Sequence, residues 1–255
     1  MVLATGRSPW AGVAEIAGAL GLADPQITMQ GALYSVPGTP ILHRARSLRR
    51  EIYLETLDAA AELGIEPIVS VIHGHRVVAG GRWLEETRPA FAMTHSVRVV
   101  RSLHEVADER PMRVFLPTPP HSHEMTRLAL AARFAGRASI SRSDTSGVEI
   151  LAHGTSKGDA LAWLAASLGL GLDRVAAIGD AWNDLEMLHT AGRSAAMGNA
   201  PHDVQAVADV IVPTSDQDGI LHAFAWLLPE LARDLGTDGS AIHAGGPAVM
   251  TRTVA

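Results

Sequence analysis

Two acidic side chains, four residues apart, follow an apolar run that ends at a glycine. Asp180 and Asp184 lie directly after the run Val175–Ile178 and Gly179. Ligands bind at the carboxyl ends of parallel strands, and two carboxylates there can hold one cation. Mg²⁺ suits such a pair, because it usually takes one or two carboxylates together with waters and a substrate phosphate. The spacing therefore predicts a magnesium site, with simple capping of the next helix as the alternative.

A basic residue at the start of a helix is the second chemical signal. Lys157, in Ser156-Lys157-Gly158, is the only lysine in the sequence, and every other Lys/Arg position is arginine. A compact ammonium differs physically from a planar guanidinium, so a site that needs the former would keep lysine. At a helix start it can meet an anion beside unpaired backbone N–H groups. We interpret Lys157 as an anion-binding residue, with an ordinary solvated lysine as the alternative.

A hydroxyl residue near the first residue of the chain is the third signal. Thr5 follows a short apolar stretch and precedes Gly6 and Arg7, after which a helical pattern runs from Pro9 to Leu20. A hydroxyl between a strand and a helix can hydrogen-bond a phosphate oxygen. Capping of the helix is the alternative reading, and Arg7 could equally pair with a surface acid.

The elements that would position these residues fall into two patterns. From residue 37 to 145, arginine and histidine are frequent, and strand-like and helix-like segments indicate a small α+β layer. After residue 147, continuous apolar runs alternate with helical segments, which is typical of a parallel sheet covered on both faces. The tail from residue 236 is rich in Gly, Thr and Ala, and we expect it to be disordered.

The composition excludes several classes of function. The formal net charge of −6 argues against a nucleic-acid partner, and the absence of cysteine excludes disulfides and thiolate sites. No apolar run reaches the roughly 18 residues that span a bilayer. Histidine pairs in the middle block could bind zinc only with a third ligand. We expect a cytoplasmic protein without a membrane or nucleic-acid partner.

Together, these segments resemble the Cof-like phosphatases of the haloacid dehalogenase (HAD) superfamily. The order and spacing of the family's motifs agree along most of the chain. The matching segments are Leu3–Arg7, Ile27–Ala32, Lys157-Gly158, Gly179–Asp184, Ala196–Ala200, Ala208-Asp209 and Asp218-Gly219.

The resemblance implies a fold and a role for each site residue. Thr5 would hold the transferring phosphoryl group together with Gly6 and Arg7, Lys157 would neutralise it, and Asn183 would lie near it. Asp180 and Asp184 would hold Mg²⁺, and the substrate would be a small phosphorylated metabolite. The fold would be a Rossmann-like α/β core, residues 1–36 and 146–235, with an inserted α+β cap domain, residues 37–145.

One family motif is missing from the sequence. The family's nucleophile and general acid belong to Asp-x-Asp-Gly-Thr, at the end of a first core strand upstream of the Thr5 motif, yet only four residues precede Thr5. Asp216-Gln217-Asp218-Gly219 has similar letters, but three residues separate it from the strand-like run Val210–Val212. We therefore expect a truncated or mis-started form, with its first strand missing and its activity impaired. Gln30 and Ala181 also stand where the family often has asparagine.

Three interpretations follow from these observations. The first is a Mg²⁺-dependent phosphomonoester hydrolase whose full-length form is active. The second is a catalytically dead, phosphate-binding or regulatory relative that keeps Thr5, Lys157 and Asp180. The third is a nonfunctional fragment. The presence of both Asp180 and Asp184, the acids that would hold Mg²⁺, favours the first interpretation.

Overall fold

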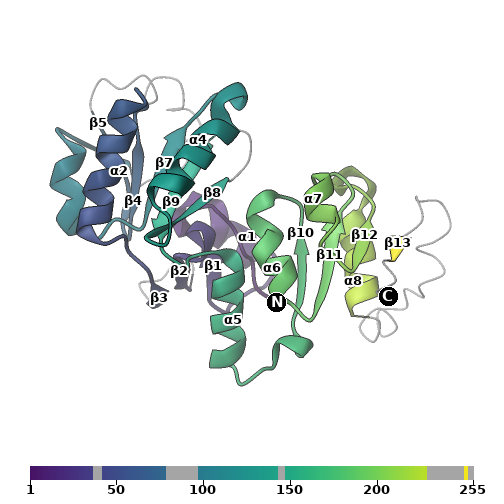
Figure 1. Ribbon diagram of the computed structural model, residues 1–255. Helices are drawn as coiled ribbons and strands as arrows, with labels where there is room; N and C mark the ends of the chain where they lie inside the picture. The colour runs from purple at the N-terminus through teal and green to yellow at the C-terminus, as the bar shows by residue number, and fades with distance from the viewer. Residues whose placement is uncertain (37–41, 79–96, 143–146, 229–249, 252–255) are drawn as a thin grey trace. The chain divides into compact units, whose positions relative to one another are not determined.

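The computed structural model describes residues 1–36, 42–78, 97–142, 147–228 and 250–251 (Figure 1). The chain divides into two compact units, residues 1–160 and 161–255. Each unit has its own sheets and its own buried core, so each is described by itself.

The first unit begins with a segment that pairs with a later strand. Ala4 forms a parallel bridge with Ile27, and a π-helical turn, Pro9–Val13, leads into helix α1, Ala14–Ala19. The helix stops where Gly21 takes a φ of +67°, as the sequence predicts. An antiparallel sheet follows, in which β2 pairs with both β1 and β3. Its strands are β1 Gln26–Thr28, β2 Leu33–Ser35 and β3 Leu42–Ala45.

A larger sheet of six strands dominates the first unit, in the order β6-β5-β4-β7-β9-β8. Its pairs are antiparallel except for β5 and β6, which run parallel. The strands are β4 Ile68–Val71, β5 Gly74–Val78, β6 Val97–Val100, β7 Arg113–Pro117, β8 Ala138–Arg142 and β9 Gly147–Ala152.

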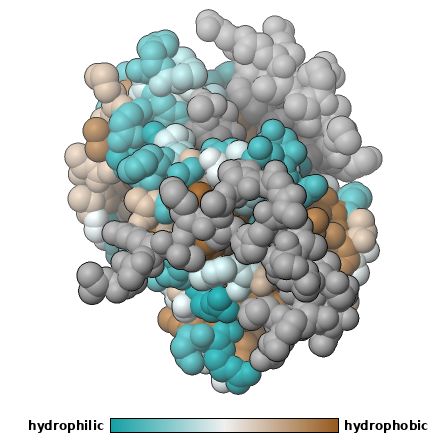
Figure 2. Space-filling view, turned by 90° about the vertical axis from the view of Figure 1, so that its right-hand side faces the viewer, coloured by the Kyte–Doolittle hydropathy of each residue, from teal (hydrophilic) through white to brown (hydrophobic). Residues whose placement is uncertain are grey.

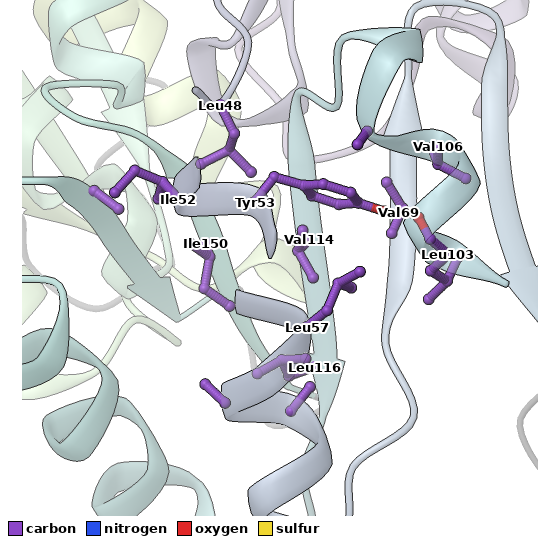
Figure 3. Close-up of a cluster of buried hydrophobic side chains, with 14 of the residues drawn as sticks. Leu48, Ile52, Tyr53, Leu57, Val69, Leu103, Val106, Val114, Leu116 and Ile150 are labelled. Atoms are coloured by element: carbon purple, nitrogen blue, oxygen red, sulfur yellow. Dashed lines mark hydrogen bonds between the residues drawn. The ribbon is translucent and has the colours of Figure 1, made fainter. Parts of the chain in front are cut away.

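Helices α2, Arg50–Glu62, and α4, Pro120–Arg133, pack on this sheet together with a 3₁₀ helix, Leu103–Glu109. Their apolar residues form one buried cluster with the inward side chains of the strands (Figure 3). Tyr53 of α2 is fully buried there, and its hydroxyl donates to the carbonyl of Leu103 at 2.7 Å. Along β7, Val114 and Leu116 alternate with less buried residues, which places both side chains on the helix-covered face.

Helix α5, Lys157–Ser167, spans the division between the units. The second unit contains a four-stranded sheet, β10-β11-β12-β13, in which the first three strands run parallel and β13 is antiparallel. Its strands are β10 Ala176–Gly179, β11 Arg193–Met197, β12 Val210–Val212 and β13 Met250-Thr251. Its helices are α6 Leu185–Thr190, α7 His202–Gln205 and α8 Gly219–Leu227.

The structure adds detail to several sequence expectations. The predicted cap boundary at residue 145 falls between β8 and β9, yet these strands pair, so the six-stranded sheet continues to Ala152. The division into core and cap otherwise stays a prediction. The expected disordered tail mostly lies outside the described residues, but Met250 and Thr251 pair with β12. Helix α4 begins at Pro120, because proline at the first helical position costs no N–H bond.

Candidate active site

The Thr5 loop is held to β1 by backbone hydrogen bonds. Thr5 N donates to Ile27 O at 2.9 Å, and Gln30 N donates to Thr5 O at 3.2 Å. The Thr5 hydroxyl accepts from Arg7 N at 3.1 Å, which orients the oxygen and leaves its own hydrogen as a donor. Thr5 is half-buried, whereas Arg7 is exposed. The loop can thus present a hydroxyl donor from a fixed backbone.

The turn Met29–Gly31 is a run of three left-handed residues, with φ values of 49°, 58° and 90°. Left-handed backbone costs an L-residue about 1–2 kcal/mol, so Met29 and Gln30 must be held by their surroundings. Met29 is fully buried among Ala32, Leu33 and neighbouring residues of the larger sheet. Strain of this kind is concentrated at functional sites, which directs attention to what the turn contacts.

Both of the predicted phosphate-binding segments in this unit contact the turn. A Cβ on Gly31 would lie 2.1 Å from the carbonyl oxygen of Ser156, directly before Lys157. A Cβ on Gly6 would lie 2.5 Å from the Nε2 atom of Gln30. Close approach to backbone therefore requires glycine at Gly31, whereas a side chain at Gly6 would displace the Gln30 amide. The turn brings the Thr5 loop and the start of α5 to one place.

Lys157 is buried, with 6% of its surface exposed. A lysine is almost never so buried without charged or polar partners. One nearby charge is the carboxylate of Glu149 on β9, which is also fully buried. Burial raises the pKa of Glu149, while Arg113, Gln30 and Lys157 act in the opposite direction. The start of α5 thus holds a buried cation and anion in the same neighbourhood.

Glu149 connects the turn, the loop and the sheet through its two oxygens. Gln30 Nε2 donates to Oε2 at 2.6 Å, and Arg113 Nη1 donates to Oε1 at 2.8 Å. Arg113 Nη1 also donates to the carbonyl of Gly6 at 2.6 Å. At the other end of the guanidinium, Nε and Nη2 donate to Ser70 Oγ, which hydrogen-bonds His75 Nδ1 at 3.0 Å. We call Gln30, Glu149 and Arg113 the glutamate network.

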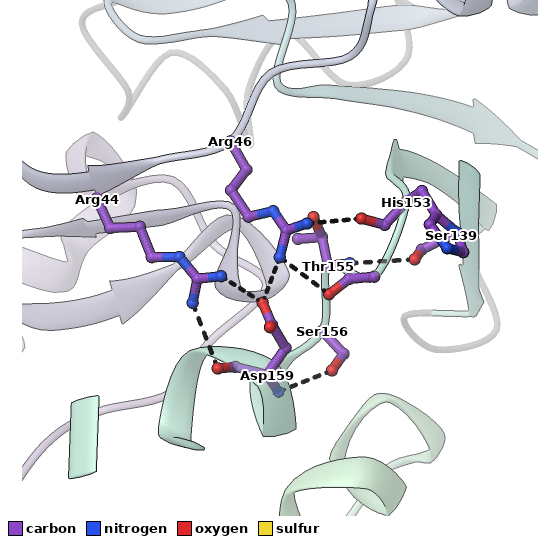
Figure 4. Close-up of polar contacts among 8 residues, drawn as sticks. Arg44, Arg46, Ser139, His153, Thr155, Ser156 and Asp159 are labelled. Atoms are coloured by element: carbon purple, nitrogen blue, oxygen red, sulfur yellow. Dashed lines mark hydrogen bonds and ion pairs between the residues drawn. The ribbon is translucent and has the colours of Figure 1, made fainter. Parts of the chain in front are cut away.

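Two arginines, Arg44 on β3 and Arg46 directly after it, hold the first turn of α5 (Figure 4). Arg44 Nη2 and Arg46 Nη1 each lie 2.7 Å from Asp159 Oδ2. Arg46 also donates to the carbonyls of His153 and Gly154. These bonds tie the loop before α5 and its first turn to the C-terminal end of β3 and the residue after it, which limits the positions that Lys157 can take.

In the second unit, Asp184 is built into the loop that follows β10. Its Oδ2 accepts from the backbone N–H groups of Asp180 and Ala181, both at 3.0 Å, and only 3% of its surface is exposed. Its Cβ packs against Gly179, where a side chain would come within 2.6 Å of it. Asp184 thus accepts from the N-cap residue of the 3₁₀ turn Trp182–Asp184, but its side chain makes no cap bond to α6.

The other predicted residues of this loop are more accessible. Asp180 is exposed and Asn183 is half-buried, while Trp182 Nε1 donates to both carboxylate oxygens of Asp203. A buried, backbone-oriented carboxylate beside an exposed one is an oxygen donor set that fits Mg²⁺, which needs few protein ligands. Within the described ranges, no group of three His, Cys, Asp or Glu side chains could hold a metal ion.

Other residues considered from the sequence have different surroundings. His73 and His75 form the first histidine pair of residues 37–145. His73 is exposed and His75 is buried against Ser70, so their side chains do not lie together at the surface. Asp216 lies in an exposed 3₁₀ turn, Ser215–Gln217, after the end of β12. That position differs from a strand tip, as the spacing predicts.

The described surface mixes residue types, and Figure 2 shows hydrophilic and hydrophobic residues side by side on one face. The exposed large apolar side chains include Met125 and Leu128 on α4 and Leu221 on α8. Among the helices that the structure describes, none has the length and apolar character needed to cross a bilayer.

Comparison with known proteins decides the family. Residues 1–224 match the model of the haloacid dehalogenase-like hydrolases. The chain belongs to this family. The HAD resemblance expected from the motifs is confirmed, and so is an α/β fold with a parallel-strand sheet and a cap domain.

Relatives of this HAD chain include phosphatases. It is 42% identical to the phosphatase YwpJ of Bacillus subtilis over 80 residues, which is 31% of this chain and 28% of that protein. It is 27% identical to the chloroplastic endoribonuclease YBEY of Arabidopsis thaliana over 234 residues, which is 88% of this chain and 40% of that protein. The matched regions thus span well under half the length of these two relatives.

Solved structures share the fold of the HAD chain. A haloacid dehalogenase-like hydrolase from B. subtilis superposes with a TM-score of 0.74 at 24% identity, covering 88% of this chain and 85% of the other. The HAD subclass IIB sugar phosphatase BT4131 gives a TM-score of 0.73 at 22% identity, covering 92% and 85%. At these identities the likeness establishes the fold.

Sequence reasoning missed the glutamate network. Glu149 is an acidic residue within the apolar run Gly147–Ala152, and a buried glutamate needs partners. That signal could have marked it as a site residue. Its partners Gln30 and Arg113 could not have been named, because they lie 119 and 36 residues away along the chain.

Proposed function

We propose that this HAD chain is a Mg²⁺-dependent phosphatase of small phosphomonoesters, with Thr5 and Lys157 as phosphate-binding residues. The observation that carries the proposal is the shared contact of both segments with the turn Met29–Gly31. Family membership supports the same reaction class. The proposal includes a cytoplasmic location, which the cysteine-free composition supports.

Each residue of the first unit has a physical role in this proposal. The Thr5 hydroxyl, whose oxygen already accepts from Arg7 N, donates its hydrogen to a phosphate oxygen. The Lys157 ammonium neutralises the charge that spreads over the phosphoryl oxygens in the transition state. Gly6 makes room for the Gln30 amide beside the loop, and Arg7 offers a second cation from the exposed side.

In the second unit, Asp180 and Asp184 would hold Mg²⁺. The ion would supply electrostatic stabilisation of the phosphoryl oxygens when bound. The backbone N–H groups of residues 180 and 181 fix the Asp184 carboxylate, and Asp180 remains accessible from solvent. Asn183, half-buried beside them, is proposed to contact the phosphate.

One observation favours a second candidate, a phosphate-binding relative without turnover. The 255 residues contain no Asp-x-Asp-Gly-Thr segment, and Asp216 lies in an exposed turn rather than at a strand tip. A phosphatase of this kind needs a carboxylate to attack phosphorus. This candidate would bind phosphate through Thr5 and Lys157 without forming a covalent intermediate.

The test separates binding from turnover. Calorimetric titration with inorganic phosphate and Mg²⁺ measures binding, and release of p-nitrophenol from its phosphate ester measures hydrolysis. Lys157→Ala and Asp180→Asn should each weaken phosphate binding in the presence of Mg²⁺ at least about tenfold, which corresponds to about 1.4 kcal/mol. Asp216→Asn is the matched control and should change neither measurement.

Each outcome assigns one function. Binding without hydrolysis supports the binding relative, and hydrolysis that depends on Lys157 and Asp180 supports the active enzyme. Loss of either activity in Asp216→Asn would show that the acidic turn, rather than the Thr5 and Lys157 segments, carries the chemistry. An unaltered chain that binds no phosphate would refute both candidates.

A further inference from the structure

The glutamate network is a buried polar arrangement of the first unit that the proposed function does not use. It joins residues of three separate segments: the left-handed turn, β7 and β9. Its members contact the Thr5 loop in two places, since Arg113 donates to the Gly6 carbonyl and the Gln30 amide abuts the Gly6 Cα. A buried carboxylate is costly to retain unless its interactions are needed.

We propose that Glu149 is a positioning residue for the phosphate site, which it organises by holding Gln30 and Arg113 against Gly6. This inference rests on the proposed function, because it assigns a role in phosphate binding to a residue that does not itself meet phosphate.

The geometry explains how one carboxylate orients the loop. With one donor on each oxygen, Glu149 fixes both the Gln30 amide and the Arg113 guanidinium. Arg113 then fixes the Gly6 carbonyl, so the peptide between Gly6 and Arg7 cannot rotate freely. The Arg7 N–H of that peptide donates to the Thr5 hydroxyl. The orientation of the proposed phosphate donor thus depends on Glu149 through three successive hydrogen bonds.

Two further observations fit this role. Among the described residues, the Gln30 Oε1 atom is buried without a hydrogen-bond partner, so the amide is held by its Nε2 bond to Glu149 alone. The carboxylate also acts electrostatically on Lys157, the other proposed phosphate-binding residue. Glu149 therefore influences both the hydroxyl and the ammonium of the proposed site.

The main test is Glu149→Gln, which keeps the shape and removes one acceptor. Its amide NH₂ must face one of the two donors, Gln30 Nε2 or Arg113 Nη1. We expect inorganic phosphate, titrated with Mg²⁺ present, to bind about tenfold more weakly, as expected from loss of one charge-assisted hydrogen bond. The Gly6 carbonyl ¹³C resonance should shift in the ligand-free protein, because its bond from Arg113 weakens.

A milder variant and a rescue keep the test interpretable if Glu149→Gln folds poorly. Gln30→Asn shortens the amide by one methylene, removes its bond to Glu149 and leaves the Arg113 ion pair in place, so phosphate binding should fall about threefold. The double variant Glu149→Gln with Gln30→Glu exchanges the two side chains and restores one acceptor to each donor. It should recover most of the lost phosphate affinity.

Tyr53→Phe is the control for stability alone. It removes one buried hydrogen bond of the same unit, from the Tyr53 hydroxyl to Leu103 O, and touches none of the network. It should lower the melting temperature while phosphate affinity and the Gly6 resonance stay unchanged. A parallel loss of affinity in Tyr53→Phe would show that Glu149 acts only through stability, which overturns the positioning role.

The two proposals fail in different ways. If the unaltered chain binds no phosphate, the proposed function is refuted, and the positioning role is refuted with it. If the unaltered chain binds phosphate and Lys157→Ala abolishes that binding, but Glu149→Gln binds as tightly as the unaltered chain, only the positioning role is refuted.

Discussion

The Thr5 loop and the Asp180–Asp184 loop both carry predicted site residues, but different kinds of groups support them. The Thr5 loop depends on side chains that are distant in sequence, since Arg113 reaches Gly6 across 107 residues. The acidic loop supports itself, because Asp184 accepts N–H bonds from residues three and four positions before it. Substitutions far along the chain can therefore alter the Thr5 loop, whereas the Asp180–Asp184 loop depends on a few contiguous residues.

The largest effect should come from disrupting the contact between the turn Met29–Gly31, which supports the Thr5 loop, and Ser156, directly before α5. Gly31→Ala would place a Cβ 2.1 Å from Ser156 O at a φ of 90°. Strain and overpacking together should cost about 3–5 kcal/mol of unfolding free energy, measured by urea denaturation. Gly21→Ala, also at positive φ but with no atom near the new Cβ, should cost only about 1 kcal/mol. Equal losses would contradict the close contact.

The self-supporting loop should depend on one carboxylate. Asp184→Ala leaves two backbone N–H groups without their acceptor, so the unfolding free energy should fall by about 3 kcal/mol. Asp180→Ala removes an exposed carboxylate and should cost no more than about 0.5 kcal/mol. Calorimetric titration with Mg²⁺ should nevertheless show weaker binding in both variants. A stable Asp184→Ala protein would disprove its supporting role.

The same contrast explains what could be predicted from the sequence. The acidic loop was recognised because its glycine, aspartates and preceding strand are contiguous, and strand and helix periodicity is local. The glutamate network was missed because its partners meet only after the sheet order β7-β9 forms.

A pH titration probes His75, which hydrogen-bonds Ser70 beside Arg113 of the glutamate network. Burial and the neighbouring arginines lower the pKa of His75 from 6.5 to about 3. The unfolded chain therefore binds a proton first as the pH falls, so this contribution to stability is complete above pH 6.5 and is lost progressively toward pH 3. Between pH 8 and pH 5 the unfolding free energy should fall by about 2 kcal/mol from this group.

Replacement of the histidine tests that assignment. His75→Gln should reduce the pH dependence of the urea midpoint by this amount, whereas His121→Gln, which alters an exposed residue, should leave it unchanged. An identical pH dependence in the His75→Gln and unaltered proteins would show that other groups cause the acid destabilisation.

The smallest effect should distinguish a partly exposed ion pair, that of Asp159, from the buried ion pair of Glu149. Asp159 is 34% exposed, and its arginine partners keep bonds to backbone carbonyls when it is neutralised. Asp159→Asn should therefore cost about 1 kcal/mol or less, and that cost should shrink in 1 M salt, where the screening length is about 3 Å. The cost of Glu149→Gln should persist at the same salt concentration, because ions cannot reach a buried carboxylate. Equal salt sensitivity in the two variants would mean that the Glu149 carboxylate is accessible to solvent, contrary to its burial among Gln30 and Arg113.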